Sequence, residues 1–97
     1  MQREDFICTI GYDGNNALVD KRARARYGKA DAATLLEQGL FRQAFCAALY
    51  DGGDEGLENF AAAFSATTGM ADMTPLKLKR LFGVFEVPGD EINVKRV

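Results

Sequence analysis

The sequence predicts a small α+β fold, on two observations. Segments rich in aromatic and β-branched residues lie toward both ends of the chain, which is typical of strands. Between them, over residues 34–82, apolar residues recur at the spacing of amphipathic helices. With 97 residues, 47% hydrophobic and 27% charged, the chain is expected to form a single compact α+β domain over 1–97.

A β-hairpin is predicted over residues 6–19. Alternate residues from Phe6 to Tyr12, including Cys8 and Ile10, would lie on one inward face of the first strand. The sequence Asp-Gly-Asn-Asn at 13–16 favours a tight turn, because Gly and Asn tolerate a positive φ. Residues 17–19 would then return as the second strand.

The segment 20–27 allows two interpretations. Asp20 can cap a short helix of good helix formers that ends at Gly28. The alternation of Arg22, Arg24 and Arg26 with small or aromatic residues also suits an extended strand. We favour the helix.

Three helices are predicted next. The first, over 34–50, has apolar residues at the i, i+3, i+4 positions and would end at the glycine pair 52–53. Gly39 would lie inside this helix at a cost of about 1 kcal/mol, which a close approach of another backbone would explain. The second helix covers 55–67. The third covers 75–82, with Thr74 at the N-cap, Pro75 at the first helical position and Gly83 beyond its end.

A C-terminal β-hairpin is predicted over 84–97. Its strands would be 84–87 and 92–97, joined by a type II turn over 87–90 with Pro88 and Gly89 at its centre. The simplest arrangement joins both hairpins into one small antiparallel sheet with helices on one face.

Composition excludes several classes of function. The chain has no histidine, so Ser-His and Cys-His catalysis are ruled out, and two cysteines make neither a disulfide framework nor a four-ligand zinc site. We therefore expect no catalytic residues, no cofactor and no metal. No apolar run could span a membrane and no signal peptide is evident, so a cytoplasmic location is expected.

Charge is segregated along the chain although the net charge is only −2. Basic residues gather over 21–29 and on one side of the helix 75–82. We expect such residues to face acids of this chain or of a partner, or to form a solvated surface, and phosphates or nucleic acid are the alternative ligands. The candidate contact residues are Arg22, Arg24, Arg26, Lys77, Lys79 and Arg80.

The order of the last elements supports an alternative function. Helices 55–67 and 75–82 followed by a hairpin over 84–97 resemble a winged helix-turn-helix, with 74–82 as its recognition helix. That resemblance implies a nucleic-acid-binding protein in which Lys77, Lys79 and Arg80 face DNA and the hairpin is the wing. The exposed side of the helix lacks Asn, Gln or Ser for reading base edges.

The favoured function is a small non-catalytic module for protein interaction or self-assembly, of unknown pathway. The predicted helix 34–50 carries only two charges and is apolar on nearly all sides, so it would need covering on both faces. We expect a homodimer with twofold symmetry as the simplest way to cover it, with another protein as the other candidate partner. The candidate interface residues are Leu35, Gly39, Cys46 and Tyr50.

Overall fold

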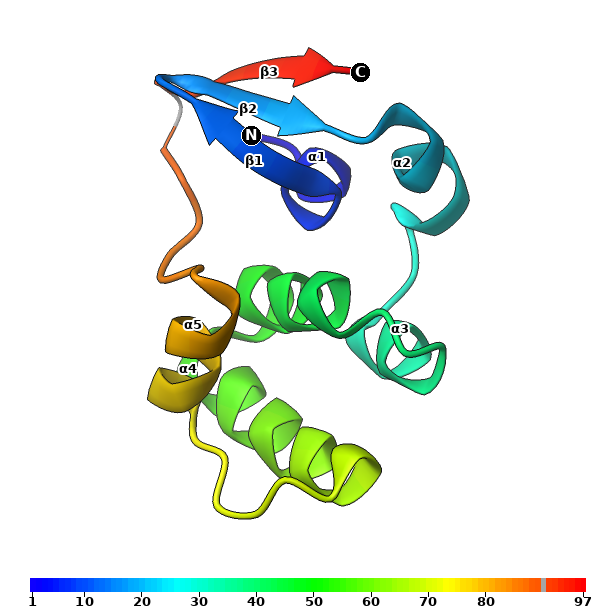
Figure 1. Cartoon of the computed structure of the whole chain (residues 1–97), viewed down its shortest axis with the longest axis vertical. Coiled ribbons are helices and arrows are strands. Elements are labelled where there is room, and N and C mark those ends of the chain that lie inside the picture. Colours follow the sequence, from blue (N-terminus) through cyan, green and yellow to red (C-terminus); the bar gives the residue numbers. More distant parts are fainter. Residues whose placement is uncertain (90) are drawn as a thin grey trace. The chain divides into compact units, whose positions relative to one another are not determined.

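The computed structural model describes residues 1–89 and 91–97 and has an α+β fold (Figure 1). It contains five helices and a three-stranded mixed sheet within these residues. The chain forms two compact units, one from residues 1–30 and 87–97 and the other from residues 31–86. No helix among the described residues is long and apolar enough to cross a membrane.

The first unit begins with a helix where a strand was predicted. Helix α1 (Arg3–Ile7) has Glu4 and Asp5 in its first turn, where acids favour the helix dipole. Strand β1 (Thr9–Asp13) therefore starts three residues later than predicted. An irregularity in the pairing between Thr9 and Gly11 also changes which side chains face inward. Thr9 is buried, whereas Ile10 is 64% exposed, so the predicted inward position of Ile10 was wrong.

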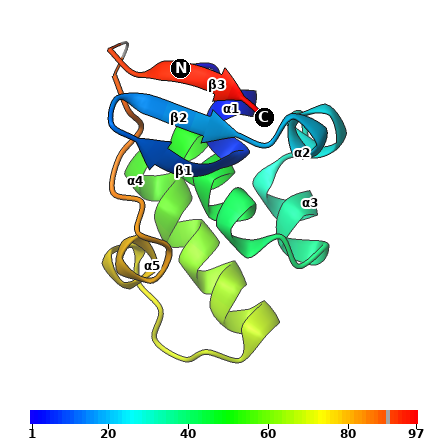
Figure 2. The ribbon, with the colours of Figure 1, turned by 45° about the horizontal axis from the view of Figure 1, so that its top comes forward.

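The sheet is mixed rather than purely antiparallel. Strand β2 (Asn16–Val19) pairs antiparallel with β1, which confirms the N-terminal hairpin and its turn. Strand β3 (Asn93–Arg96) lies on the other side of β2 and runs parallel to it (Figure 2). The predicted C-terminal hairpin was wrong, because residues 84–87 form no strand. The proposed turn at 87–90 includes residue 90, which lies outside the described residues.

Helix α2 (Lys21–Tyr27) confirms the helical interpretation of the basic segment. The Asp20 carboxylate accepts hydrogen bonds from the backbone N–H groups of Arg22 and Ala23, both at 3.0 Å. These bonds satisfy two N–H groups that otherwise have no partner at a helix start.

In the second unit, the predicted helix 34–50 is divided by Gly39. Helix α3 (Ala32–Glu37) is capped by Asp31, and Gly39 follows it with φ 77°, in the left-handed region. Helix α4 begins only at Phe41. Gly39 therefore lies between two helices and not inside one, and no atom lies within 4 Å of the position a Cβ would take there. The close backbone approach predicted for Gly39 was wrong.

Helix α4 (Phe41–Thr68) is broken at Gly53, whose φ of 58° and ψ of −150° only glycine adopts readily. Its two halves, 41–52 and 54–68, fold back on each other as a helical hairpin. The ring pairs show this directly. The ring centroids of Phe41 and Phe64 lie 5.6 Å apart, and those of Phe45 and Phe60 lie 6.1 Å apart. A residue four positions later in the first half thus contacts a residue four positions earlier in the second half, as in two antiparallel helices.

Helix α5 (Pro75–Phe82) agrees with the prediction in its start and end. The Thr74 hydroxyl accepts a hydrogen bond from the backbone N–H of Lys77, and Gly83 ends the helix with φ 69°. Phe82 stacks on Phe45 with ring centroids 5.4 Å apart. The core of this unit is therefore a cluster of phenylalanines, with Leu78 of α5 fully buried beside it.

Candidate functional site

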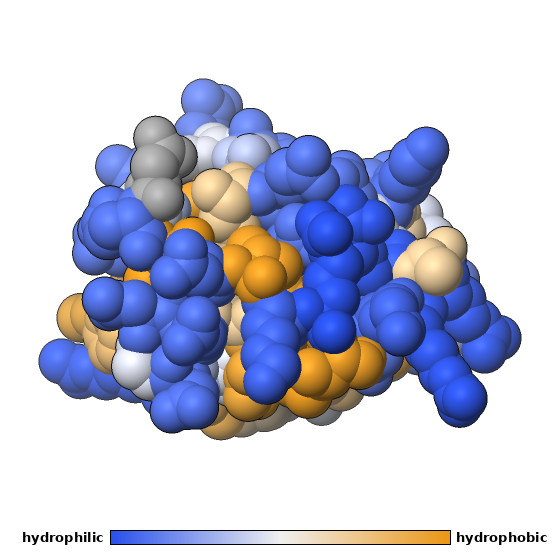
Figure 3. Space-filling view, turned by 90° about the horizontal axis from the view of Figure 1, so that it is seen from above, coloured by the Kyte–Doolittle hydropathy of each residue, from blue (hydrophilic) through white to orange (hydrophobic). Residues whose placement is uncertain are grey.

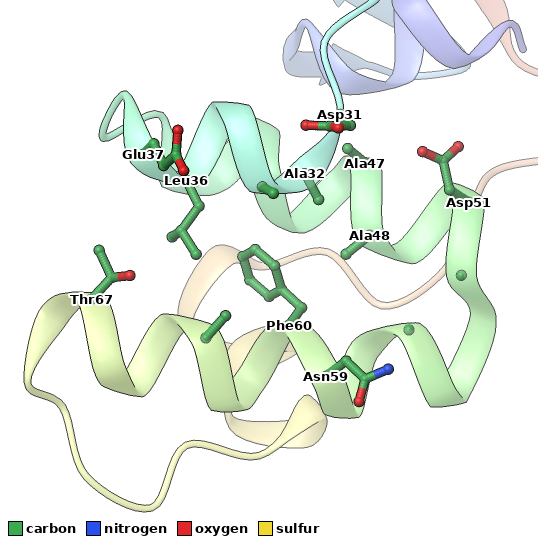
Figure 4. Close-up of a pocket in the computed structure, with 14 residues that line it drawn as sticks. Asp31, Ala32, Leu36, Glu37, Ala47, Ala48, Asp51, Asn59, Phe60 and Thr67 are labelled. Carbon is green, nitrogen blue, oxygen red and sulfur yellow. The ribbon is translucent and has the colours of Figure 1, made fainter.

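A groove is present in the helical unit, between helices α3 and α4. It has a volume of about 570 Å³, within the range of sites that hold ligands or partner side chains. Three helical segments form its walls, namely α3 and the two halves of α4 (Figure 4). The groove thus exists because α4 breaks at Gly53 and folds back.

The floor of the groove is apolar. Leu36 of α3 and Phe60 of α4 point into the space between these helices (Figure 4). Half of the fourteen lining residues are alanine or glycine. Small side chains on a helix surface allow another backbone to approach closely, because the distance between packed helices depends on the side chains at the contact.

Three acidic residues line the groove around this apolar floor. Asp31, Glu37 and Asp51 line the groove, and its described lining includes no lysine or arginine. All three acids are exposed, so they can meet a cation on an incoming molecule. Asn59 and Thr67 add neutral polar groups. The arrangement is suited to a ligand that presents both apolar side chains and positive charge on one face.

The candidate interface residues do not form one face. Leu35 is buried on α3, and Cys46 is buried on α4, so neither is available at a surface. Gly39 lies in the connection between these helices, and Tyr50 is 39% exposed. The single apolar helix that suggested this interface is absent from the structure. These four residues therefore do not share one helix face, which was the observation behind the predicted twofold interface.

The basic residues of α2 have different surroundings. Arg24 donates a hydrogen bond from Nε to Oδ1 of Asp5 at 2.7 Å and another from Nη2 to Oε1 of Gln2 at 2.9 Å. The guanidinium of Arg26 lies 5.3 Å from the ring centre of Tyr27, and Arg22 is exposed. Within the described residues, Arg24 is the one of the three arginines that pairs with a buried acid, and pairing of the others with acids of a partner stays a prediction.

Asp5 is the centre of an ion-pair cluster in the first unit. Its side chain is 2% exposed and bridges Arg24 and Arg96, with Arg96 donating from Nε at 3.0 Å and from Nη2 at 2.9 Å. The hydrogen bonds from Arg96 hold the pKa of Asp5 below its usual value, burial opposes them, and Arg24 lowers the pKa further. This cluster joins α1, α2 and β3, and its role is structural.

The two cysteines are buried, and they form no disulfide within the described residues. Burial, with a smaller contribution from the negative charge of Asp20, raises the pKa of Cys8 to about 11. The Cys8 thiol is thus protonated at neutral pH, which is the opposite of what a nucleophile needs. Among the described residues, no group of three or more Cys, Asp or Glu side chains is placed to hold a metal ion.

Helix α5 presents the remaining predicted contact residues. Lys77 and Arg80 are exposed, whereas Lys79 is half-buried. The ammonium of Lys77 donates a hydrogen bond to the backbone carbonyl of Asp72 at 2.9 Å. These cations are accessible, but the described residues do not provide the hairpin that the winged-helix resemblance implied.

Sequence reasoning missed the groove. The signal was the spacing of small residues, since Ala48, Gly52 and Gly56 recur every four positions and Ala63 follows in the second half of α4. Without knowledge of the break at Gly53, that pattern reads as one helix face.

Comparison of the chain with protein-family models, with curated proteins and with solved structures finds no match in any of the three.

Proposed function

We propose that this chain is a small non-catalytic protein-interaction module, and that the groove between α3 and the two halves of α4 is its binding surface. The observation that carries this proposal is the combination of an apolar floor, formed by Leu36 and Phe60, with a rim of acids. A helix that lays its apolar face into a hydrophobic groove is a common mode of peptide recognition.

The chemistry of the lining defines the partner. Apolar side chains of one or two helical turns would fill the space above Leu36 and Phe60, and the small residues would let the partner backbone come close. Lysine or arginine beside that apolar face would meet Asp31, Glu37 and Asp51. The proposed ligand is thus a basic amphipathic helix. Another face of the molecule, seen in Figure 3, is mostly hydrophilic, with hydrophobic residues exposed at its centre and along its lower edge.

A designed peptide of leucine and lysine at helical spacing is a suitable probe. We expect the 97-residue chain to bind it in a fluorescence-anisotropy titration, with affinity that falls as salt is added. A peptide of the same composition in scrambled order, without an apolar face, should bind at least about tenfold more weakly because it cannot fill the floor.

Two neighbouring alanines provide a matched pair of variants. Ala62 and Ala63 are both exposed on α4, but only Ala63 lines the groove. Ala63→Arg should therefore abolish peptide binding, whereas Ala62→Arg should leave it unchanged. Equal binding by both variants, or no binding by the wild type, would show that the groove is not the site.

The nucleic-acid alternative rests on the exposed Lys77 and Arg80 of α5. A gel-shift titration with random duplex DNA at low salt tests it, since a patch of this kind would bind phosphates in a salt-sensitive manner. We expect no shift from the wild type. A shift that disappears in Lys77→Glu would favour the alternative.

A further inference from the structure

Helix α5 carries on its outer side the kind of surface that the groove is suited to receive. Leu76 and Leu81 are each 52% exposed, and Lys77 and Arg80 lie between them on the same side of the helix. At 100° per residue, these four positions span about 140° of the helix circumference. Two leucines with two cations between them thus form a basic amphipathic face.

The inner side of α5 is already occupied. Leu78 is fully buried, and the Phe82 ring stacks on Phe45 and meets the Phe64 ring edge-on at 6.0 Å. Since these residues hold α5 against α4, the outer face points away from the helices that form the groove. The outer face can therefore not enter the groove of its own helical unit.

We infer that the partner of the groove is a second copy of this chain, which inserts the outer face of α5. This inference rests on the proposed function of the groove. Leu76 and Leu81 would cover the floor formed by Leu36 and Phe60, and the cations of α5 would meet the acids of the rim. The exposed leucines of this basic helix would otherwise remain in contact with water, at a cost that burial removes.

Charge complementarity favours this choice of partner. The groove contributes three acids, and α5 contributes Lys77, Arg80 and the half-buried Lys79. Opposite charges on two surfaces of the same chain attract copies to each other even though the whole chain has a net charge of −2.

The geometry of this contact differs from that of a twofold dimer. The groove of one copy receives α5 of the next, so each copy uses two different surfaces. Such head-to-tail contacts produce a closed ring when the rotation between copies closes and an open chain when it does not. The mean mass should thus rise with concentration beyond that of two chains.

Complementary single variants test this arrangement sharply. Ala63→Arg blocks the groove and keeps α5 intact, whereas Leu81→Glu disables α5 and keeps the groove intact. Each variant alone should stay at the monomer mass of 10.6 kDa in sedimentation equilibrium. Mixed in equal amounts, they should form a complex of two chains, because one usable groove meets one usable α5.

Two control substitutions separate this result from a general effect of added charge. Ala62→Arg should self-associate like the wild type, since Ala62 lies outside the groove. Val97→Glu should do so as well, because Val97 is 53% exposed and thus matches Leu81 in exposure but belongs to the other unit. Circular dichroism confirms that each variant is folded.

The outcomes distinguish this inference from the proposed function. If the wild type stays at 10.6 kDa at high concentration while the leucine–lysine peptide still binds, the partner is not a second copy and the groove remains a binding site. If the wild type self-associates but the two variants do not combine, a different interface is used and the inference is wrong. If the peptide does not bind, the groove proposal itself fails.

Discussion

Asp5 accepts two hydrogen bonds from the guanidinium of Arg96, although 91 positions separate the two residues in the sequence. One bond joins Nε to Oδ1 at 3.0 Å, and the other joins Nη2 to Oδ2 at 2.9 Å. This two-pronged geometry is the strongest form of an arginine–carboxylate pair. The Asp5–Arg96 pair links β3 to α1, and the hydrogen bond from Arg24 to Asp5 links α2 to the same carboxylate.

Replacement of the Asp5 carboxylate should destabilise the protein. We expect Asp5→Asn to lower the free energy of unfolding by about 2–3 kcal/mol, because a neutral amide accepts weaker bonds from the two arginines. Urea denaturation followed by circular dichroism measures the change. Asp13→Asn is the matched control, since Asp13 is exposed in the hairpin and its replacement should change stability by less than about 0.5 kcal/mol.

The same carboxylate predicts a pH dependence of stability. The pKa of Asp5 is lowered in the folded chain, so the unfolded chain takes up a proton first as the pH falls. The contribution of Asp5 is therefore complete above the unfolded value near 3.8 and is lost as the pH drops below it through the folded pKa. Thermal unfolding measured from pH 6 down to pH 2 should show this loss in the wild type below about pH 4, and Asp5→Asn should lack it.

The arginines of α2 should differ in their effect on folding. Arg24→Ala removes a bond to a buried carboxylate and should cost about 1–2 kcal/mol, whereas Arg22→Ala changes an exposed side chain and should be nearly neutral. Denaturation of the two variants side by side checks this. Equal effects would mean that the cluster around Asp5 does not stabilise the fold.

The phenylalanine cluster predicts the largest loss of stability. Phe45 is fully buried and its ring contacts Phe60 and Phe82, so Phe45→Ala should cost about 3–5 kcal/mol. A loss of this size could unfold so small a chain. Phe85→Ala serves as the control, because Phe85 is 56% exposed and its truncation leaves no cavity. An unchanged melting temperature for Phe45→Ala would contradict the assigned core.

Gly39 provides a test of the division between α3 and α4. Its φ of 77° is strained for any residue with a Cβ, so Gly39→Ala should cost about 1 kcal/mol although space is available. Gly52→Ala is the control, because Gly52 lies in the helix with open space around it and without a positive φ. That substitution should be neutral or should stabilise by up to about 1 kcal/mol.

Local chemistry made some elements predictable from the sequence. Asp20, Thr74 and Gly83 act within a few residues of their own positions, so the limits of α2 and α5 follow from capping rules. Gly39 was misjudged because apolar residues continue at helical spacing on both sides of it, and periodicity alone does not reveal a reversal of φ. The helix α1 was missed because aromatic and β-branched residues outweighed the acids of its first turn.

Capping rules do not predict contacts between segments that are distant in the sequence. Residues 93–96 were recognised as strand-forming, but nothing local shows that they pair with β2 rather than with 84–87. The groove depends in the same way on how α3 lies against a broken α4. The β2–β3 pairing and the groove both depend on tertiary contacts. A single sequence shows which residues are small or acidic, but it does not show that these residues lie on the same surface.

The parallel pairing of β2 with β3 also has a consequence for the order of folding. The helical unit is continuous from 31 to 86, whereas the pairing of β2 with β3 must wait until residues 93–96 have been synthesised. Contacts of such large sequence separation form slowly. During that delay one edge of β2 has unpaired backbone groups, which is where nascent chains would associate wrongly. We expect chains that stop before residue 93 to keep their helices and to aggregate through this edge.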